Sequence, residues 1–126
     1  MEKWISYDKI KADIELINSF TGGNRECVIN FTGKDNKKYT LSFDDVYDFR
    51  YAIENAFIGR TANTPPETSQ DISSIYIVEE SEYLKNFEYG VDWTIPIEGI
   101  KHFIIFDVVD TGIEILTTKK PVLTEI

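Results

Sequence analysis

Cys27 and His102 are the single cysteine and the single histidine of the chain, so only they could form a cysteine–histidine pair for nucleophilic catalysis. Cys27 alternates with Ile29 and Phe31, which is the usual setting of an inert core cysteine. His102 begins an apolar segment, where a hydrogen-bonded structural histidine is more common than a base. No serine lies in a Gly-x-Ser-x-Gly elbow. The sequence therefore predicts no catalytic residue.

Carboxylates are abundant, but an acidic chain must place them somewhere, and their number lowers their value as a catalytic signal. The paired or closely spaced ones are Asp44 with Asp45, Glu79 with Glu80, and Asp107 with Asp110. A chain this short leaves little room for the sugar cleft that a pair of glycosidase carboxylates requires. One cysteine and one histidine cannot supply the four ligands of structural zinc, and no segment matches the aspartate-rich calcium loop. We therefore expect no metal and no cofactor.

The most suggestive segment is 79–92, EESEYLKNFEYGVD, in which five acids and one base alternate with aromatic residues. Aromatic side chains provide contact area in protein interfaces, and carboxylates steer a basic partner. The predicted contact residues are Glu79, Glu80, Glu82, Tyr83, Phe87, Glu88 and Trp93. The competing interpretation places the aromatic residues in the core and leaves the acids as a solvated face.

Composition excludes several classes of protein. The 126 residues suit one domain, and the 42% hydrophobic share suits a folded one. The net charge of −9 repels phosphate backbones, so we expect no nucleic-acid partner. A single cysteine allows no internal disulfide, which fits a reducing compartment. The start of the chain lacks the apolar run of a signal peptide, and no run approaches the length of a membrane helix. We expect a cytoplasmic protein without membrane contact.

Several segments have clear secondary-structure patterns. Strand alternation and polar turns predict a hairpin over 26–32 and 39–43, a strand over 75–79, and a second hairpin over 102–109 and 113–116. Ser81 is placed to cap a short helix over EYLKNFE. The segment HFIIFDVV is apolar on both faces, as in a central strand.

Two segments fit more than one structure. Residues 8–20 carry isoleucines near helical spacing and predict an amphipathic helix, although alternation also allows a strand. Residues 46–58 remain open between a helix and a strand. The whole chain, 1–126, is expected to be a single α+β domain. It would have a mainly antiparallel sheet of about five to seven strands with one to three helices.

Part of the chain resembles a known group of proteins. The segments FDDVYDFRYAIE, YIVEESEYLKNF and IKHFIIFDVVDTGIEILTTKKP resemble small uncharacterised bacterial proteins, some of which look like immunity proteins carried beside toxins. The resemblance covers mainly residues 41–121 and consists of strand and turn patterns, so no catalytic residue comes with it. It implies that residues 46–53 form a strand.

These observations predict a non-catalytic, cytosolic protein-binding module whose partner is another, basic protein, and the resemblance points to a toxin-neutralising immunity protein. One alternative is a small enzyme that uses carboxylates or His102 for acid–base chemistry. Another is a structural subunit that self-associates through an exposed edge strand.

Overall fold

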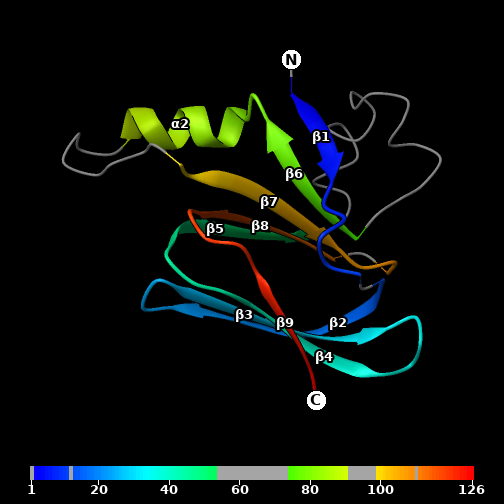
Figure 1. The fold of residues 1–126 in the computed structure, drawn as a ribbon. Helices are drawn as coiled ribbons and strands as arrows, with labels where there is room; N and C mark the ends of the chain where they lie inside the picture. Colours follow the sequence, from blue (N-terminus) through cyan, green and yellow to red (C-terminus); the bar gives the residue numbers. More distant parts are fainter. Residues whose placement is uncertain (1, 12, 54–73, 91–98, 110) are drawn as a thin grey trace.

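The computed structural model describes residues 2–11, 13–53, 74–90, 99–109 and 111–126, which build two antiparallel sheets and one helix (Figure 1). The five-stranded sheet has the order β1 (Lys3–Ser6), β6 (Ile75–Glu79), β7 (Lys101–Phe106), β8 (Thr111–Thr117) and β5 (Val46–Ile53). The four-stranded sheet has the order β2 (Ile14–Gly23), β3 (Glu26–Gly33), β4 (Lys38–Phe43) and β9 (Val122–Glu125). Helix α2 (Glu82–Gly90) lies on the five-stranded sheet.

The expected α+β class is wrong, because the described residues form nine strands and a single short helix. The helix predicted over 8–20 is replaced by strand β2. Its pairing with β3 shifts register between Ile14 and Leu16 and again between Ile17 and Ser19. Each bulge adds a residue, so Ile14, Ile17 and Phe20 all reach the core at a spacing of three. That spacing imitates a helical stripe.

The open segment 46–58 forms strand β5 as far as Ile53, and residues 54–58 lie outside the described residues. The strand agrees with the structure that the resemblance implies for 46–53. Its pairing with β8 also shifts register, between Val46 and Asp48. This bulge accounts for the apparent helical spacing of Val46 and Phe49.

The remaining predicted elements are confirmed. The hairpin of β3 and β4, the strand β6 and the helix after Ser81 form where the patterns place them. The hairpin of β7 and β8 also forms, but β7 ends at Phe106, so the prediction of a strand as far as Val109 was three residues too long. The sequence analysis did not predict β1 or β9, which are edge strands of four residues each.

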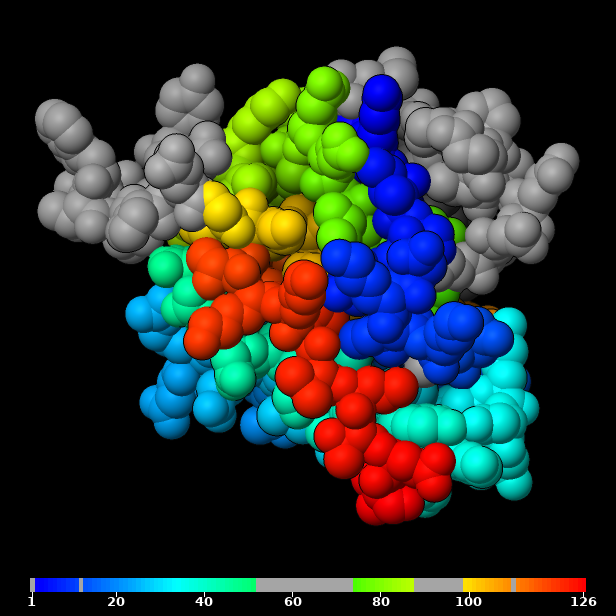
Figure 2. Space-filling view, in the orientation of Figure 1, coloured from blue at the N-terminus to red at the C-terminus, as the bar shows by residue number. Residues whose placement is uncertain are grey.

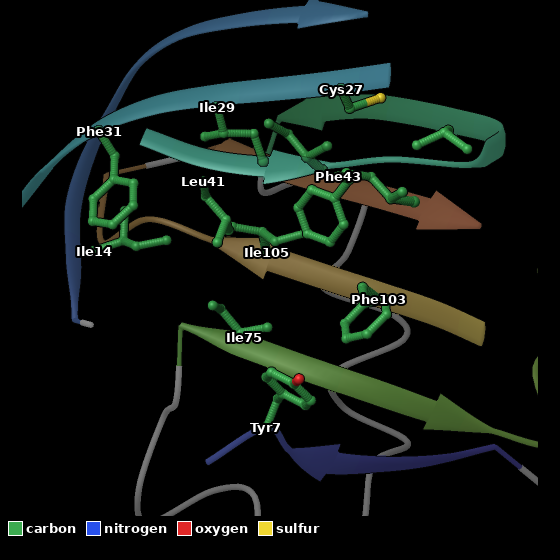
Figure 3. Close-up of a cluster of buried hydrophobic side chains, with 13 residues drawn as sticks. Tyr7, Ile14, Cys27, Ile29, Phe31, Leu41, Phe43, Ile75, Phe103 and Ile105 are labelled. Atoms are coloured by element: carbon green, nitrogen blue, oxygen red, sulfur yellow. The ribbon is translucent and has the colours of Figure 1, made fainter. Parts of the chain in front are cut away.

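The two sheets enclose the main core (Figure 3). Alternate residues of β3 and β4 face alternate residues of β7 and β8, and the rings of Phe43 and Phe103 meet with centroids 5.6 Å apart. The buried members are Tyr7, Ile14, Cys27, Ile29, Phe31, Leu41, Phe43, Val46, Ile75, Phe103, Ile105, Ile113 and Ile115. Each large apolar side chain buried here stabilises the fold by about 1.5–3 kcal/mol.

The outer face of the five-stranded sheet is buried as well. Trp4, Tyr76, Val78 and Ile104 form a second cluster there, and Leu116 packs beside Tyr83 of α2 in a third. Strand β7 therefore has apolar partners on both faces. This confirms the central position that its sequence predicts.

Asp107 joins the β7–β8 turn to the other sheet. One carboxylate oxygen accepts hydrogen bonds from the backbone N–H groups of Val109 and Thr111, at 3.1 and 3.0 Å. The other accepts one from the N–H of Ile17 in β2, at 3.0 Å. This carboxylate therefore closes the turn of the hairpin that the sequence predicts over 102–109 and 113–116.

Asp35 organises the turn between β3 and β4. Its carboxylate accepts hydrogen bonds from the N–H of Lys37, at 3.0 Å, and from the hydroxyl of Tyr39, at 2.5 Å. The bond with Tyr39 is the main cause that lowers the pKa of Asp35 and raises the pKa of Tyr39 to about 12. Because the folded-state pKa of Asp35 is lowered, its stabilising effect is present above the ordinary value of 3.8. The effect is lost as the pH falls through the folded value.

We expect Asp35→Asn to move the pKa of Tyr39 from about 12 down toward the ordinary value of 10.0, because the neighbouring negative charge is gone. A spectrophotometric titration of the phenols, recorded as a difference between variant and parent, measures this shift. Asp44→Asn, which removes an exposed carboxylate elsewhere, is the control. A difference curve without a displaced tyrosine would contradict the assignment.

Candidate functional site

A hydroxyl, an imidazole and a carboxylate converge beneath helix α2. Ser81 immediately precedes the helix, His102 lies on β7 and Glu114 lies on β8. The Oγ of Ser81 is 2.6 Å from Nδ1 of His102, and Nε2 of His102 is 2.8 Å from Oε1 of Glu114. The β7–β8 register places both side chains on the outer face of the sheet, the face on which Leu116 packs against Tyr83 of the helix.

These three residue types also form acyl-transfer triads, but here they are closed to a substrate. Ser81, His102 and Glu114 have exposed fractions of 4%, 0% and 3%. The Oγ of Ser81 also accepts a hydrogen bond from the N–H of Leu84 at 2.9 Å, so the hydroxyl caps the helix. A hydroxyl that donates to Nδ1 and an Nε2–H that donates to the carboxylate leave the neutral imidazole fully satisfied.

An ion pair and an aromatic ring extend this network to the edge of the sheet. The guanidinium of Arg50 is 2.8 Å from Oε2 of Glu114 and lies 3.6 Å from the ring centroid of Tyr83. The hydroxyl of Tyr83 donates a hydrogen bond to Asp48 at 2.7 Å. Burial, followed by the bond to Asp48, raises the pKa of Tyr83. Arg50 thus balances a carboxylate that would be costly to bury alone.

The network acts as a structural clamp, because it links the start of α2 to three strands of the sheet. It fixes the junction of β6 and α2, where the predicted acidic contact residues lie. Sequence reasoning missed the clamp. His102, Glu114 and Arg50 meet only through strand register, which a linear pattern does not show.

We expect Ser81→Ala to lower the free energy of unfolding by about 2 kcal/mol, because it removes the helix cap and the hydroxyl that bonds to Nδ1 of buried His102. Urea unfolding followed by circular dichroism measures the change. Ser19→Ala, at an exposed position of β2, is the matched control and should change stability by less than about 0.5 kcal/mol. Equal effects of the two substitutions would contradict the clamp.

Cys27 and His102 do not form a dyad. Cys27 points into the core between the sheets, whereas His102 occupies the outer face of the five-stranded sheet. Burial raises the pKa of the Cys27 thiol to about 11. The prediction that Cys27 lies in the core is confirmed, since its side chain is fully buried.

Cys27 should therefore resist a soluble thiol reagent in the native protein at pH 8 and react fully after denaturation, because the thiolate is the reactive form. The rate of colour release by an aromatic disulfide reagent, with and without urea, measures this. Rapid labelling of the native protein would contradict the buried position.

The predicted acidic contact residues gather on one ridge. Glu79 ends β6, Glu80 has a left-handed φ of 53° and Glu82 opens α2, and all three are exposed. We call Glu79, Glu80 and Glu82 the acidic ridge. The carboxylate of Glu2 accepts a hydrogen bond from the N–H of Glu82 at 2.9 Å, which ties the ridge to the N-terminal strand. Figure 2 shows this strand (blue) beside the β6–α2 region (green).

The structure separates the predicted aromatic contacts from these acids. Tyr83 has an exposed fraction of only 6%, and Phe87 packs against the cluster that Tyr83 forms with Leu116. The side chain of Glu88 and the whole of Trp93 lie outside the described residues. Among the described contact residues, the exposed ones are therefore the three glutamates. Their role in binding a partner stays a prediction.

A second exposed surface, which the sequence analysis did not single out, lies where β2 approaches β5. Its exposed members are Phe49 and Tyr51 of β5, with exposed fractions of 39% and 58%. The half-buried ring of Phe20 from β2 contacts both Phe49 and Tyr51, with centroids 5.3 and 6.3 Å apart. The sequence signal that could have indicated this surface is that Phe49 and Tyr51 share one face if residues 46–58 form a strand.

Other kinds of site find little support. No cluster of three or more potential metal ligands occurs among the described residues. Within the same residues, no helix is long and apolar enough to span a membrane. An open depression of about 440 Å³ lies between the β1–β2 segment and the β3–β4 turn, and its wall includes Asp35 and Tyr39, which bond to each other.

Comparison of this chain with protein-family models, with curated proteins and with solved structures finds no match. Function therefore has to be inferred from the residues and geometry described above. The resemblance to immunity proteins stays a prediction.

Proposed function

We propose that this chain is a non-catalytic, cytosolic module that binds a basic protein through the acidic ridge. The observation that carries the proposal is the exposure of Glu79, Glu80 and Glu82 side by side on a junction that the buried clamp holds in place. A rigid surface loses little conformational entropy on binding, which favours affinity.

Charge supports a basic protein as the partner. The net charge of −9 gives the whole molecule a field that attracts a cation-rich surface and repels nucleic acid. Many toxins that attack nucleic acids have basic clefts, and an acidic inhibitor would reach such a cleft by electrostatically steered association. A toxin-neutralising immunity protein is the specific form of this proposal.

The enzyme alternative receives less support from the geometry. Both ring nitrogens of His102 have hydrogen-bond partners, and the ring has no exposed surface. An acid or base must come within hydrogen-bond reach of a substrate proton, and this imidazole is covered.

The charge reversal Glu79→Lys, Glu80→Lys and Glu82→Lys should abolish capture of the partner, because the carboxylates that steer it are replaced by like charges. The tagged chain, its reversal variant and a control are compared in pull-downs from cells of the source organism, read by mass spectrometry at low and moderate salt. The partner should be a basic protein that the parent captures and that is lost as salt rises.

The control variant reverses three exposed acids away from the ridge, at Asp13, Glu26 and Glu125, and so changes the net charge equally. It should retain the partner if the ridge is the binding site. Equal loss of partner capture in both variants would show that capture depends on the overall charge and not on the acidic ridge. Retention by the ridge variant would overturn the proposal.

A further inference from the structure

Strand β5 ends the five-stranded sheet, and no other strand of the described residues pairs with its outer edge. One side of it pairs with β8 from Val46 to Ile53. The other backbone hydrogen bond that the described part of the chain gives to β5 runs from the N–H of Val46 to the carbonyl of Arg25, at 2.9 Å. An edge strand of this length presents unpaired backbone groups to any strand that can lie beside it.

The side chains next to this edge are apolar and partly exposed. Phe49 and Tyr51 have exposed fractions of 39% and 58%, and both touch Phe20 of β2. The ring of Phe49 lies so close to Gly22 that a β-carbon there would come within 2.7 Å of it. An exposed aromatic group beside an open strand edge is an interaction surface.

The order of residues along β5 indicates that its pairing partner is β5 of a second copy of this chain. Asp48, Phe49 and Arg50 place an acid and a base at equal distances from a central aromatic residue. When a strand pairs antiparallel with its own copy about Phe49, each Asp48 lies opposite Arg50 of the other copy. Opposite charges in such cross-strand positions are stabilising.

Neighbouring registers lack this fit. A shift that centres the pairing on Asp48 or on Arg50 places two like charges directly opposite each other, which is destabilising. A shift by a single residue reverses the faces and sets a charge against Phe49. The acid–aromatic–base order is thus specific for one two-fold register.

Both charged groups retain bonding capacity for a second copy. Asp48 accepts the hydroxyl of Tyr83 through Oδ2, and Arg50 uses Nη2 on Glu114. A carboxylate has about four acceptor positions and a guanidinium has five N–H donors. The side chain of Arg50 is 47% exposed, so a partner can reach it.

We propose that this protein forms a two-fold symmetric homodimer in which β5 pairs antiparallel with β5 of a second copy about Phe49. The five-stranded sheets of the two copies then join into one continuous sheet. The two-fold axis is perpendicular to that sheet, so Phe20, Phe49 and Tyr51 of both copies meet on the same face. Such an isologous contact closes on itself and does not propagate into a fibre.

The test begins with sedimentation velocity over a wide range of protein concentration, at about 0.15 M salt, where the repulsion between two acidic molecules is screened. The parent should shift from monomer to dimer as concentration rises. Tyr51→Lys should abolish this shift. Val122→Lys, at a 59% exposed position on the edge strand β9, should leave it unchanged.

The register is tested separately by oxidation. Phe49→Cys places two thiols opposite each other across the two-fold axis, within reach of a disulfide, and should give a covalent dimer. Tyr51→Cys moves the two thiols apart along antiparallel strands and should not. Buried Cys27 does not take part in either case. Circular dichroism establishes that each variant is folded.

A parent that stays monomeric at every concentration, and a folded Phe49→Cys variant that gives no covalent dimer, would overturn the proposal. The remaining partner for the edge of β5 would then be an extended segment of a different protein. A dimer that survives Tyr51→Lys but is lost in Val122→Lys would place the contact on β9 and would also overturn it.

Discussion

The fold depends on one buried negative charge. Glu114 lies in the middle of β8 with almost no exposed surface, and an unpaired carboxylate in that position would be strongly destabilising. Arg50 supplies the opposite charge, and His102 supplies a hydrogen bond on the other oxygen. Ser81, which completes the hydrogen bonding of that imidazole, also starts α2. The requirement to satisfy a single carboxylate thus fixes β5, β7, β8 and the helix relative to one another.

The need to satisfy the Glu114 carboxylate also explains why His102 and Ser81, whose residue types resemble those of catalytic triads, have a structural role. Catalysis needs a reacting group that a substrate can approach, whereas the Ser81 hydroxyl and both ring nitrogens of His102 are buried and bonded to other parts of the chain. The result is a stiff outer layer on the five-stranded sheet. Exposed acids at one end and an exposed aromatic edge at the other are held in place by it.

Much of the sheet structure was predictable, because β3 and β4 alternate clearly, β7 is apolar on both faces like a central strand, and polar turns separate the strands of both hairpins. The prediction of a helix over 8–20 was wrong because two bulges in β2 lengthen the repeat from two residues to three. Strands of four residues such as β1 and β9 carry too few positions for a pattern, and only pairing with a distant strand defines them.

The site was predictable only in part. The acids of the ridge could be placed on the surface because carboxylates are rarely buried without partners. Tyr83 and Phe87 were predicted as contact residues, with a place in the core as the competing interpretation, and α2 turns both toward the sheet. The clamp and the β5 edge depend on which strands become neighbours, and the linear sequence does not contain that information in readable form.

The sheet topology also sets an order of assembly. Strands β2, β3 and β4 follow one another along the chain, so the loops that join them cost little entropy to close. The five-stranded sheet instead pairs Lys3 with Glu79 and Phe49 with Ile115, across long stretches of sequence. During synthesis the β2–β4 meander can form early, with its apolar face uncovered until β7 and β8 emerge. A nascent chain that has formed this meander therefore exposes the core-facing side chains of β2–β4 to solvent until β7 and β8 pack against them.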